Sequence, residues 1–197
     1  PQTTHCFIIW EQIIIEGHLM QGIDFVFSVA VLIFSVVIHE VSHGYAANAL
    51  GDSTAKHAGR LTLNPLPHLD LFGSLVLPLI TYWAGGFIFG WAKPVPYNPY
   101  NLSNQRWGPA IVAAAGPAAN LLIALIFGLL IRIAPVIGAP AGFMSIATTI
   151  VFINILLAVF NFVPIPPLDG SKILFSVLSP HYGYIQDGNY VFNHPEF

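Results

Sequence analysis

The sequence predicts an all-α membrane protein, a polytopic helical bundle with about three to four membrane-embedded segments and short extended or re-entrant connectors. The first observation is composition: 55% of the 197 residues are hydrophobic and only 8% are charged, with a mean hydropathy of +0.72. A soluble domain carries about 25% charged residues, so these few charges could not cover a water-exposed surface. The second observation is that four apolar stretches are long enough to span a bilayer, for which a helix needs ~20 residues.

The four apolar stretches differ in how regular a helix they can form. They run from about residue 23 to 50, 71 to 91, 109 to 131 and 143 to 163. The second contains Pro78 and the pair Gly85 and Gly86, which interrupt a regular helix and suit a broken, re-entrant element shielded by protein. An apolar run at 7–15, interrupted by Glu11, is too short to cross and either lies in the membrane interface or extends the first helix.

Both connectors around the second stretch are polar and contain basic residues: Lys56, Arg60, Lys93 and Arg106. If the second stretch crosses the membrane, these four charges are divided between its two sides. If the stretch re-enters, which we favour, all four lie on one side, and the positive-inside rule makes that side cytoplasmic. Because the connectors, residues 51–70 and 92–108, are rich in Pro, Asn and Gly, they predict turns and short extended pieces, not helices.

Domain organisation follows from the length and from the position of the apolar stretches. A chain of 197 residues predicts one domain, residues 1–197, with a membrane core at about 24–180. Residues 1–22 are expected to be peripheral or interfacial, and residues 181–197 form a polar and aromatic tail that is divergent or truncated. The net charge of -3 gives no indication of nucleic-acid binding, and the single cysteine excludes an intramolecular disulfide bond.

The motif with the most chemical content is HEVSH at residues 39–43, near the end of the first apolar stretch. His39 and His43 are four residues apart, so on a helix both imidazoles project from one face and could bind one zinc ion. Glu40 lies near enough to take a proton from an activated water, and about 0.01 such motifs are expected by chance in this composition. The three residues could instead only hydrogen-bond one another, but ionisable groups in a membrane segment usually carry function.

A catalytic zinc site needs a third protein ligand and an open fourth position. His57 and His68 lie in the first polar connector and could reach back toward the histidine pair. Asp169 is better placed, because the prolines of NFVPIPPLDG (161–170) end the fourth helix and Gly170 lets the chain turn just after the acid. The alternative is that Asp169 caps the helix that follows. Beside the HEVSH motif, we favour the ligand role.

Three motifs occur in order: HEVSH in an apolar helix, AAAGPAAN at 113–120 opening another, and NFVPIPPLDG ending a third. The phrases GRLTLNPLPHLD at 59–70 and GWAKPVPYNPYNL at 90–102 stand between the first two. Over roughly residues 24–180, the chain resembles the site-2 protease family of intramembrane zinc metalloproteases, in its compact prokaryotic form without a PDZ or CBS domain. The resemblance implies an integral membrane protein of the prokaryotic cell (plasma) membrane, with its active site toward the cytoplasmic side.

The resemblance also implies roles for individual residues. His39, His43 and Asp169 would bind one zinc ion per chain, and Glu40 would be the catalytic base. Asn161 matches the family's asparagine upstream of LDG, which is thought to lie near the zinc and could steady the oxyanion or bind the substrate backbone. Considered by its chemistry alone, an amide near zinc can donate to an oxyanion, a contribution often worth ~3 kcal/mol. It can equally satisfy backbone groups freed by the prolines.

The GPAAN segment, which ends at Asn120, is more simply structural. Small residues let helices pack closely in lipid, and Pro117 suits a first helical turn. Asn120 is expected to hydrogen-bond across helices or to position the site, with substrate binding, shared with Asn161, as a further role. The connector segments GRLTLNP (59–65) and KPVPYNP (93–99) could add an edge to an unwound substrate strand, or could only cover the site.

Together these features predict an intramembrane zinc endopeptidase that hydrolyses a peptide bond in or near a transmembrane segment of a membrane-protein substrate. Its partners would be that transmembrane substrate and the lipid bilayer, without nucleic acid and with the oligomeric state open. The alternative is a non-catalytic zinc-binding membrane protein or adaptor, in which His57 or His68 supplies a fourth ligand and closes the site. A zinc transporter is disfavoured, because the outer half of the first helix (25–37) offers almost no polar residues.

Overall fold

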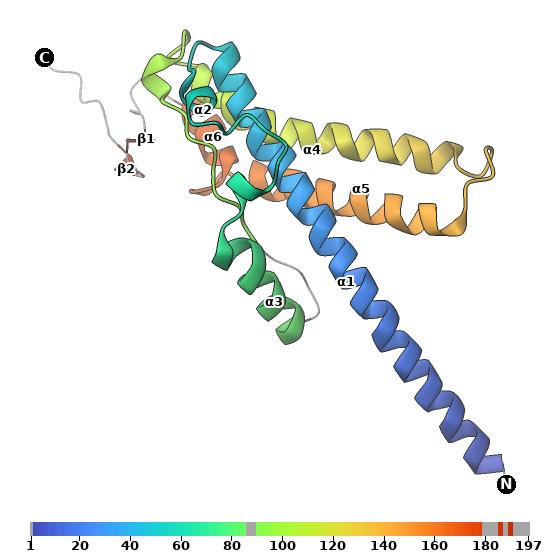
Figure 1. Cartoon of the computed structure of the whole chain (residues 1–197). Helices are drawn as coiled ribbons and strands as arrows, with labels where there is room; N and C mark the ends of the chain where they lie inside the picture. The colour runs from blue at the N-terminus through green and yellow to red at the C-terminus, as the bar shows by residue number, and fades with distance from the viewer. Residues whose placement is uncertain (1, 86–89, 179–184, 187–188, 191–197) are drawn as a thin grey trace, which may run out of the picture.

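The computed structural model describes residues 2–85, 90–178, 185–186 and 189–190, with side chains for 25–84, 90–140 and 142–178. Three long helices dominate the architecture: α1 (Gln2–Ala49), α4 (Gly108–Ile133) and α5 (Ala141–Phe162) (Figure 1). Each contains an apolar segment long enough to cross a membrane: Phe25–Ala49, Gly108–Ile133 and Gly142–Phe162. These helices confirm the predicted all-α membrane fold, and α1 continues through residues 7–15, which therefore extend the first helix.

The remaining elements are short. They are α2 (Thr54–His57), α3 (Leu77–Gly85), α6 (Asp169–Leu178), the 3₁₀ turns Leu66–His68 and Pro99–Asn101, the π-helical turn Phe72–Val76, and two strands, β1 (Ile185–Gln186) and β2 (Asn189–Tyr190). The two strands pair antiparallel. Apart from them, the tail predicted to be divergent, 181–197, lies outside the described residues.

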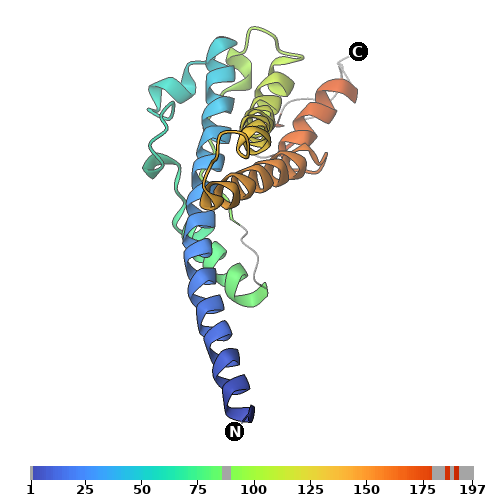
Figure 2. The same cartoon turned by 90° about the vertical axis from the view of Figure 1, so that its right-hand side faces the viewer.

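The helices α4 and α5 lie side by side as an antiparallel pair and pack against the C-terminal half of α1 (Figures 1 and 2). The helix α6 follows α5 and packs against α4. The face of α4 toward α1 is built from residues with little exposed surface: Val112, Ala113, Gly116, Pro117 and Asn120. Because most of these side chains are small, the two backbones can approach closely, which is how helices associate in lipid.

The motif AAAGPAAN does not open its helix, as the sequence suggested, but lies inside α4. Pro109 occupies the first turn instead, and Pro117 lies in the helix interior, where it is fully buried. Proline has no N–H, so Pro117 cannot donate to the carbonyl of Ala113, four residues earlier. Membrane helices tolerate such a missing bond when neighbouring groups in the bundle compensate for it.

The second apolar stretch forms a re-entrant hairpin beside α1. Trp91 N donates a hydrogen bond to Gly73 O (3.0 Å), so the end of the segment lies beside its beginning. Its apolar helix, Phe72–Ala84, is about 20 Å long, which is less than the ~30 Å of a bilayer core. Its far end packs on α1, where the ring centroids of Phe25 and Tyr82 are 4.2 Å apart. Both polar connectors therefore lie at one end of the hairpin, as the sequence favoured.

Asp52 joins the two polar connectors. Its carboxylate is fully buried and accepts hydrogen bonds from Thr54 N (3.1 Å) and Thr54 Oγ1 (2.5 Å). It also accepts from two residues of the second connector, Asn98 N (2.7 Å) and Asn101 Nδ2 (2.9 Å). The bonds to Thr54 support the start of α2, a helical turn in a connector that was predicted to lack helices. That prediction is wrong at α2, because a buried carboxylate supplies the acceptor that a helix start requires.

The extended segment KPVPYNP (93–99) uses most of its backbone donors within the chain. Its N–H groups at Lys93, Val95 and Asn98 donate to His68 O, the Glu40 carboxylate and the Asp52 carboxylate, and its three prolines have none. Within this segment, only the backbone N–H of Tyr97 could therefore donate to a partner strand. Of the two roles predicted for this segment, covering the site therefore fits better than adding an edge to a substrate.

Replacing Asp52 by alanine should destabilise the fold. Asp52→Ala removes the acceptor of four hydrogen bonds and leaves their donors without a partner, so the free energy of unfolding should fall by about 2–4 kcal/mol. Lys56→Ala changes an exposed side chain of the same connector and should alter that energy by less than about 0.5 kcal/mol. Denaturant titration of the detergent-solubilised chain measures both. Equal stability of Asp52→Ala and the unchanged protein would contradict this role of Asp52.

The same pair of proteins should differ in their response to acid. Burial alone raises the pKa of Asp52, but the hydrogen bonds from Thr54, Asn101 and Asn98 outweigh it and hold the pKa below its ordinary value. A lowered pKa contributes stability above the unfolded value, and this stability is lost as pH falls through the folded pKa. The stability difference between the unchanged protein and Asp52→Ala should therefore shrink below about pH 3.9.

Candidate metal centre

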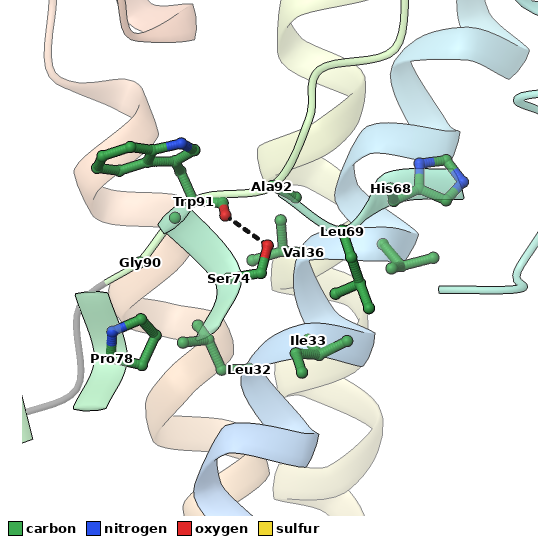
Figure 3. Close-up of a pocket in the computed structure, with 12 residues that line it drawn as sticks. Leu32, Ile33, Val36, His68, Leu69, Ser74, Pro78, Gly90, Trp91 and Ala92 are labelled. Atoms are coloured by element: carbon green, nitrogen blue, oxygen red, sulfur yellow. Dashed lines mark hydrogen bonds between the residues drawn. The ribbon is translucent and has the colours of Figure 1, made fainter. Parts of the chain in front are cut away.

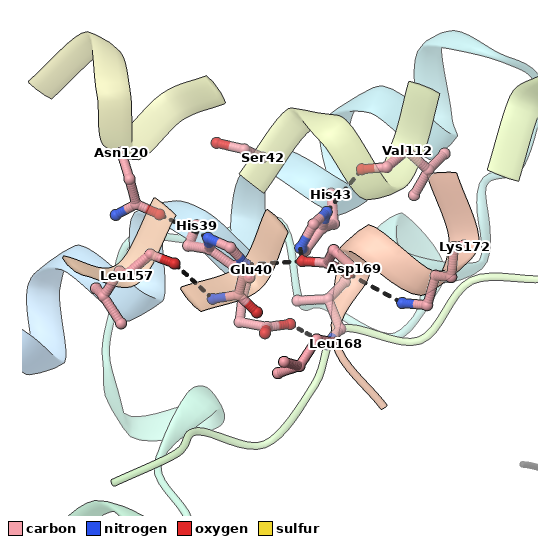
Figure 4. Close-up of polar contacts among 12 residues, drawn as sticks. His39, Glu40, Ser42, His43, Val112, Asn120, Leu157, Leu168, Asp169 and Lys172 are labelled. Atoms are coloured by element: carbon pink, nitrogen blue, oxygen red, sulfur yellow. Dashed lines mark hydrogen bonds and ion pairs between the residues drawn. The ribbon is translucent and has the colours of Figure 1, made fainter. Parts of the chain in front are cut away.

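The C-terminal part of α1 carries His39 and His43 one turn apart, and the start of α6 brings Asp169 against them (Figure 4). His39 Nε2 and His43 Nε2 each lie 3.1 Å from Asp169 Oδ2. The candidate ligand atoms of the three residues all lie within 4.8 Å of one another. Zinc bonds of about 2.0–2.2 Å separate tetrahedral ligands by about 3.3 Å, so these side chains could hold one zinc ion.

The chain presents Asp169 by breaking the fourth apolar helix, as predicted. The helix α5 ends at Phe162, residues 163–168 form no regular helix, and α6 begins at Asp169. Gly170 is not the turn residue expected from the sequence, since its φ does not lie in the left-handed region. A Cβ at Gly170 would collide with the carbonyl groups of Phe162 and Val163, so glycine is needed there for the close approach of α6 to the end of α5.

Both histidines are held in the tautomer that suits a metal ligand. His43 Nδ1 lies 2.7 Å from Val112 O, and His39 Nδ1 lies 2.6 Å from Asn120 Oδ1. Carbonyl oxygens only accept hydrogen bonds, so each Nδ1 carries the proton and each Nε2 presents a lone pair toward Asp169 Oδ2. Two lone pairs and a carboxylate oxygen that converge in this way form the donor set of a cation site, and metal-binding histidines commonly have such second partners.

Gly116 of α4 leaves space beside the two imidazoles. A Cβ at this position would lie 2.5 Å from His43 Nε2 and 2.6 Å from His39 Nε2, closer than side-chain atoms normally approach. Any larger residue would push the rings apart or fill the position of the ion. Sequence reasoning attributed the small residues of GPAAN to helix packing, so this role of Gly116 was not predicted.

Lys172 holds the second oxygen of Asp169. Its Nζ lies 3.1 Å from Asp169 Oδ1, the oxygen that is not shared with the histidines (Figure 4). The same Nζ lies 6.0 Å from the ring centroid of Tyr97. With Oδ1 occupied, Asp169 would coordinate a metal through Oδ2 alone, which leaves a position for water. The side chain of Asp169 is therefore directed to the site, and capping of α6, the alternative considered for it, does not account for these contacts.

Glu40 neighbours His39 on α1 but does not join the three candidate ligands. Its Oε2 accepts a hydrogen bond from Val95 N (2.8 Å), in the extended segment that covers the site. Val95 is only 6% exposed, so this bond is shielded from bulk water. The contact holds one carboxylate oxygen, Oε2, in place.

Neither histidine of the first connector supplies a fourth ligand in the part of the chain that the structure describes. His57 is exposed at the end of α2, and His68 is fully buried with its Nε2 3.0 Å from Thr62 O. The group that could hold a metal contains only the two histidines of α1 and the aspartate of α6. A site with three protein ligands keeps a fourth position open, which is the arrangement of catalytic rather than structural zinc.

The two asparagines of interest lie in different surroundings. Asn161, half-buried near the end of α5, donates from Nδ2 to Leu157 O of its own helix (2.9 Å). Asn120 is fully buried, with hydrogen bonds to His39 and Asn154. Direct substrate binding, one of the roles considered for Asn120, does not fit a residue without exposed surface. Positioning of His39, the other role, fits its contacts.

An apolar cavity lies between α1 and the re-entrant hairpin, one to two helical turns from Glu40 toward the N-terminus (Figure 3). Leu32, Ile33 and Val36 line it from α1, and Trp91 lies opposite them at the end of the hairpin. Val36, which lines the cavity, lies one helical turn before Glu40 on the same face of α1, and Glu40 itself is not among the lining residues.

Comparison with known proteins agrees with this arrangement. The sequence model of Peptidase family M50 matches residues 130–189, which contain Asp169 and its NFVPIPPLDG motif. The chain is 37% identical over 158 residues to "Putative zinc metalloprotease YwhC" of Bacillus subtilis, an alignment that covers 77% of this chain and 69% of that protein. No solved structure matches this chain.

Two further relatives carry similar names. "Putative zinc metalloprotease Rip2" of Mycolicibacterium smegmatis is 33% identical over 159 residues, which cover 80% of this chain and 58% of that protein. "Zinc metalloprotease MJ0392" of Methanocaldococcus jannaschii is 25% identical over 181 residues, which cover 91% of this chain and 43% of that protein. The chain thus spans 43% to 69% of the length of these relatives. It belongs to peptidase family M50, the site-2 protease family of zinc metalloproteases.

Proposed function

We propose that this protein is an intramembrane zinc endopeptidase, which hydrolyses a peptide bond in or near a transmembrane segment of a membrane-protein substrate. The observation that carries the proposal is the three-ligand site of His39, His43 and Asp169, with the carboxylate of Glu40 beside it. Three ligands and a neighbouring base are what a hydrolytic zinc centre requires. The alternative of a closed, non-catalytic zinc site would need a fourth protein ligand from residues such as His68.

The proposed mechanism assigns a separate task to each side chain. Zinc held by the three ligands would supply Lewis-acid activation of a water and of the scissile carbonyl. Glu40 would take a proton from the attacking water at Oε1, while Val95 N–H holds Oε2 in place. The same carboxylate would then give that proton to the leaving amine. Lys172 would keep Asp169 bound through a single oxygen.

The depth of the site would reconcile water chemistry with an apolar helix. His43 lies about 9 Å along the helix axis from Ala49, the last residue of α1. The polar connectors lie at this same end of α1 and could admit water to the ligands. The basic residues of these connectors favour a cytoplasmic position by the positive-inside rule. We therefore place the site just below the cytoplasmic face of a prokaryotic cell membrane.

A transmembrane protein is the substrate class that this arrangement favours. The small apolar cavity between α1 and the hairpin would have to widen to receive an apolar side chain next to the scissile bond. The connector segment 59–65, in which Leu63 is 62% exposed, remains the better candidate to pair with an unwound strand. The oxyanion role of Asn161 stays a prediction, and it requires the amide to leave Leu157 O.

Glu40→Gln should abolish cleavage while zinc stays bound. Glutamine keeps the shape of the side chain and an oxygen for Val95 N–H, but it cannot take a proton from water. Cleavage of single-pass membrane reporters in proteoliposomes should fall roughly 10²–10⁴-fold. Zinc content, measured by mass spectrometry on the same preparation, should match that of the unchanged protein. Persistent cleavage in this variant would sink the assignment of Glu40 as the base.

Gly116→Ala should weaken zinc binding roughly 100-fold, because the added methyl group would lie 2.5–2.6 Å from ligand nitrogens of both histidines. Gly128→Ala is the matched control, since a Cβ at this position of the same helix meets nothing within 4 Å. Competition with a chromogenic chelator measures the zinc dissociation constant of both variants. An unchanged constant in Gly116→Ala would show that the ligand geometry does not depend on this glycine.

A further inference from the structure

We propose that Asn154 of α5 sets the tautomer of His39 through Asn120, and is thereby a positioning residue for the metal centre. The inference rests on the proposed zinc site and concerns zinc binding rather than peptide cleavage. It starts from a buried polar network that the apolar composition of the helices does not explain, because polar side chains are costly inside a membrane bundle.

The network extends from His39 into the bundle through three residues, one from each long helix. Asn120, Asn154 and Ser35 are 0%, 0% and 4% exposed. Asn120 Nδ2 donates to Asn154 Oδ1 (2.7 Å) and, at 3.4 Å, to Ser35 O. Asn154 Nδ2 donates to Ser35 Oγ and to Ile150 O, each at 2.9 Å. Two of these acceptors, Ser35 O and Ile150 O, are backbone carbonyls that only accept, so they indicate which end of each amide donates.

The direction of the Asn120 amide decides whether His39 can be a ligand. The two ends of a carboxamide have nearly the same shape but opposite hydrogen-bonding character. With its oxygen toward His39 Nδ1, as here, Asn120 accepts the ring proton and leaves a lone pair on Nε2. With its NH₂ group toward Nδ1, the proton would lie on Nε2, and that tautomer cannot bind a metal through Nε2.

Asn154 contributes most to this direction, because its contact with the Asn120 NH₂ group is short (2.7 Å), whereas the other acceptor of that group, Ser35 O, lies at 3.4 Å. Asn154 Oδ1 accepts from the NH₂ group of Asn120, so the oxygen of Asn120 must face His39. Asn154 cannot itself reverse, because its NH₂ group donates to Ile150 O, a backbone carbonyl that only accepts. In an apolar bundle a reversed amide would find no water to satisfy it. His43 needs no such chain of amides, since a backbone carbonyl, Val112 O, contacts it directly.

Buried amides can also act only as links between helices in lipid. The two roles predict different losses, since a link contributes to stability alone, whereas a positioning residue also changes zinc affinity. Ser35→Ala separates them. This variant removes one hydrogen bond of the Asn154 NH₂ group. Ile150 O still accepts from that group and holds the direction of the Asn154 amide.

The test measures zinc dissociation constants by chelator competition on the full chain in detergent. Asn154→Leu, which keeps the size but removes the acceptor, should weaken zinc binding about 10–100-fold. Ser35→Ala should lower the thermal midpoint but change the zinc constant by less than about twofold. If Asn154→Leu and Ser35→Ala both lower the thermal midpoint and leave the zinc constant unchanged, the network is only a structural link and the proposal is overturned.

A second variant provides rescue. In Asn120→Asp, either carboxylate oxygen can accept from His39 Nδ1, so the direction no longer depends on residue 154. Adding Asn154→Leu to Asn120→Asp should therefore cost less than about threefold in zinc affinity. A loss in this background as large as in the unchanged one would overturn the proposal, because Asn154 would then act through something other than the amide direction.

A measurement on the unchanged chain keeps the proposal falsifiable even if the leucine variant does not fold. Nitrogen-15 NMR of the zinc-free protein at alkaline pH reports which ring nitrogen of His39 carries the proton, with the signal assigned by its loss in His39→Gln. The proton is expected on Nδ1, and a proton on Nε2 would overturn the proposal. Failure of the unchanged protein to bind zinc at all would instead count against the proposed function.

Discussion

The convergence of two imidazole nitrogens and one carboxylate oxygen is the constraint on which the rest of this structure depends. Such a donor set is unfavourable in an apolar bundle unless a cation neutralises it, and it needs a defined geometry to hold one. Each surrounding element contributes to that geometry. The helix α4 gives room at Gly116 and an acceptor at Val112, while the break between α5 and α6 delivers Asp169 at the right level.

The polar connectors and the re-entrant hairpin complete the surroundings of that centre. The buried carboxylate of Asp52 fastens the two connectors together, and the second connector then places Val95 N–H on Glu40. The two ends of the hairpin meet where Trp91 N–H donates to Gly73 O, so both polar connectors start from the same end of it. The proposed water chemistry would thus lie at the end of α1 that is next to the polar connectors, and the long apolar part of α1 would face lipid.

The polar contacts around the ligands also have a defined direction. A backbone carbonyl, which only accepts, ends each series of hydrogen bonds that begins at a histidine. Val112 O accepts directly from His43, and Ile150 O accepts from Asn154, which is linked to His39 through Asn120. Lys172 acts similarly on the other ligand, because it occupies one carboxylate oxygen and leaves one free. The three candidate ligands are therefore held by partners from α4 and α6, and α5 contributes one contact further away, through Asn154.

The sequence by itself determined the membrane helices, the HEVSH pair and Asp169, because apolar length, helical spacing and proline breaks are local properties of the chain. The re-entrant hairpin could also be expected, since Pro78 and the Gly-Gly pair weaken a helix locally. Only the tertiary structure decided the roles of Gly116, Asp52, Lys172 and Asn154. Their meaning depends on what a distant segment places beside them: a glycine next to two rings, or an amide whose direction is set from another helix. Residue spacing along one chain does not carry that information.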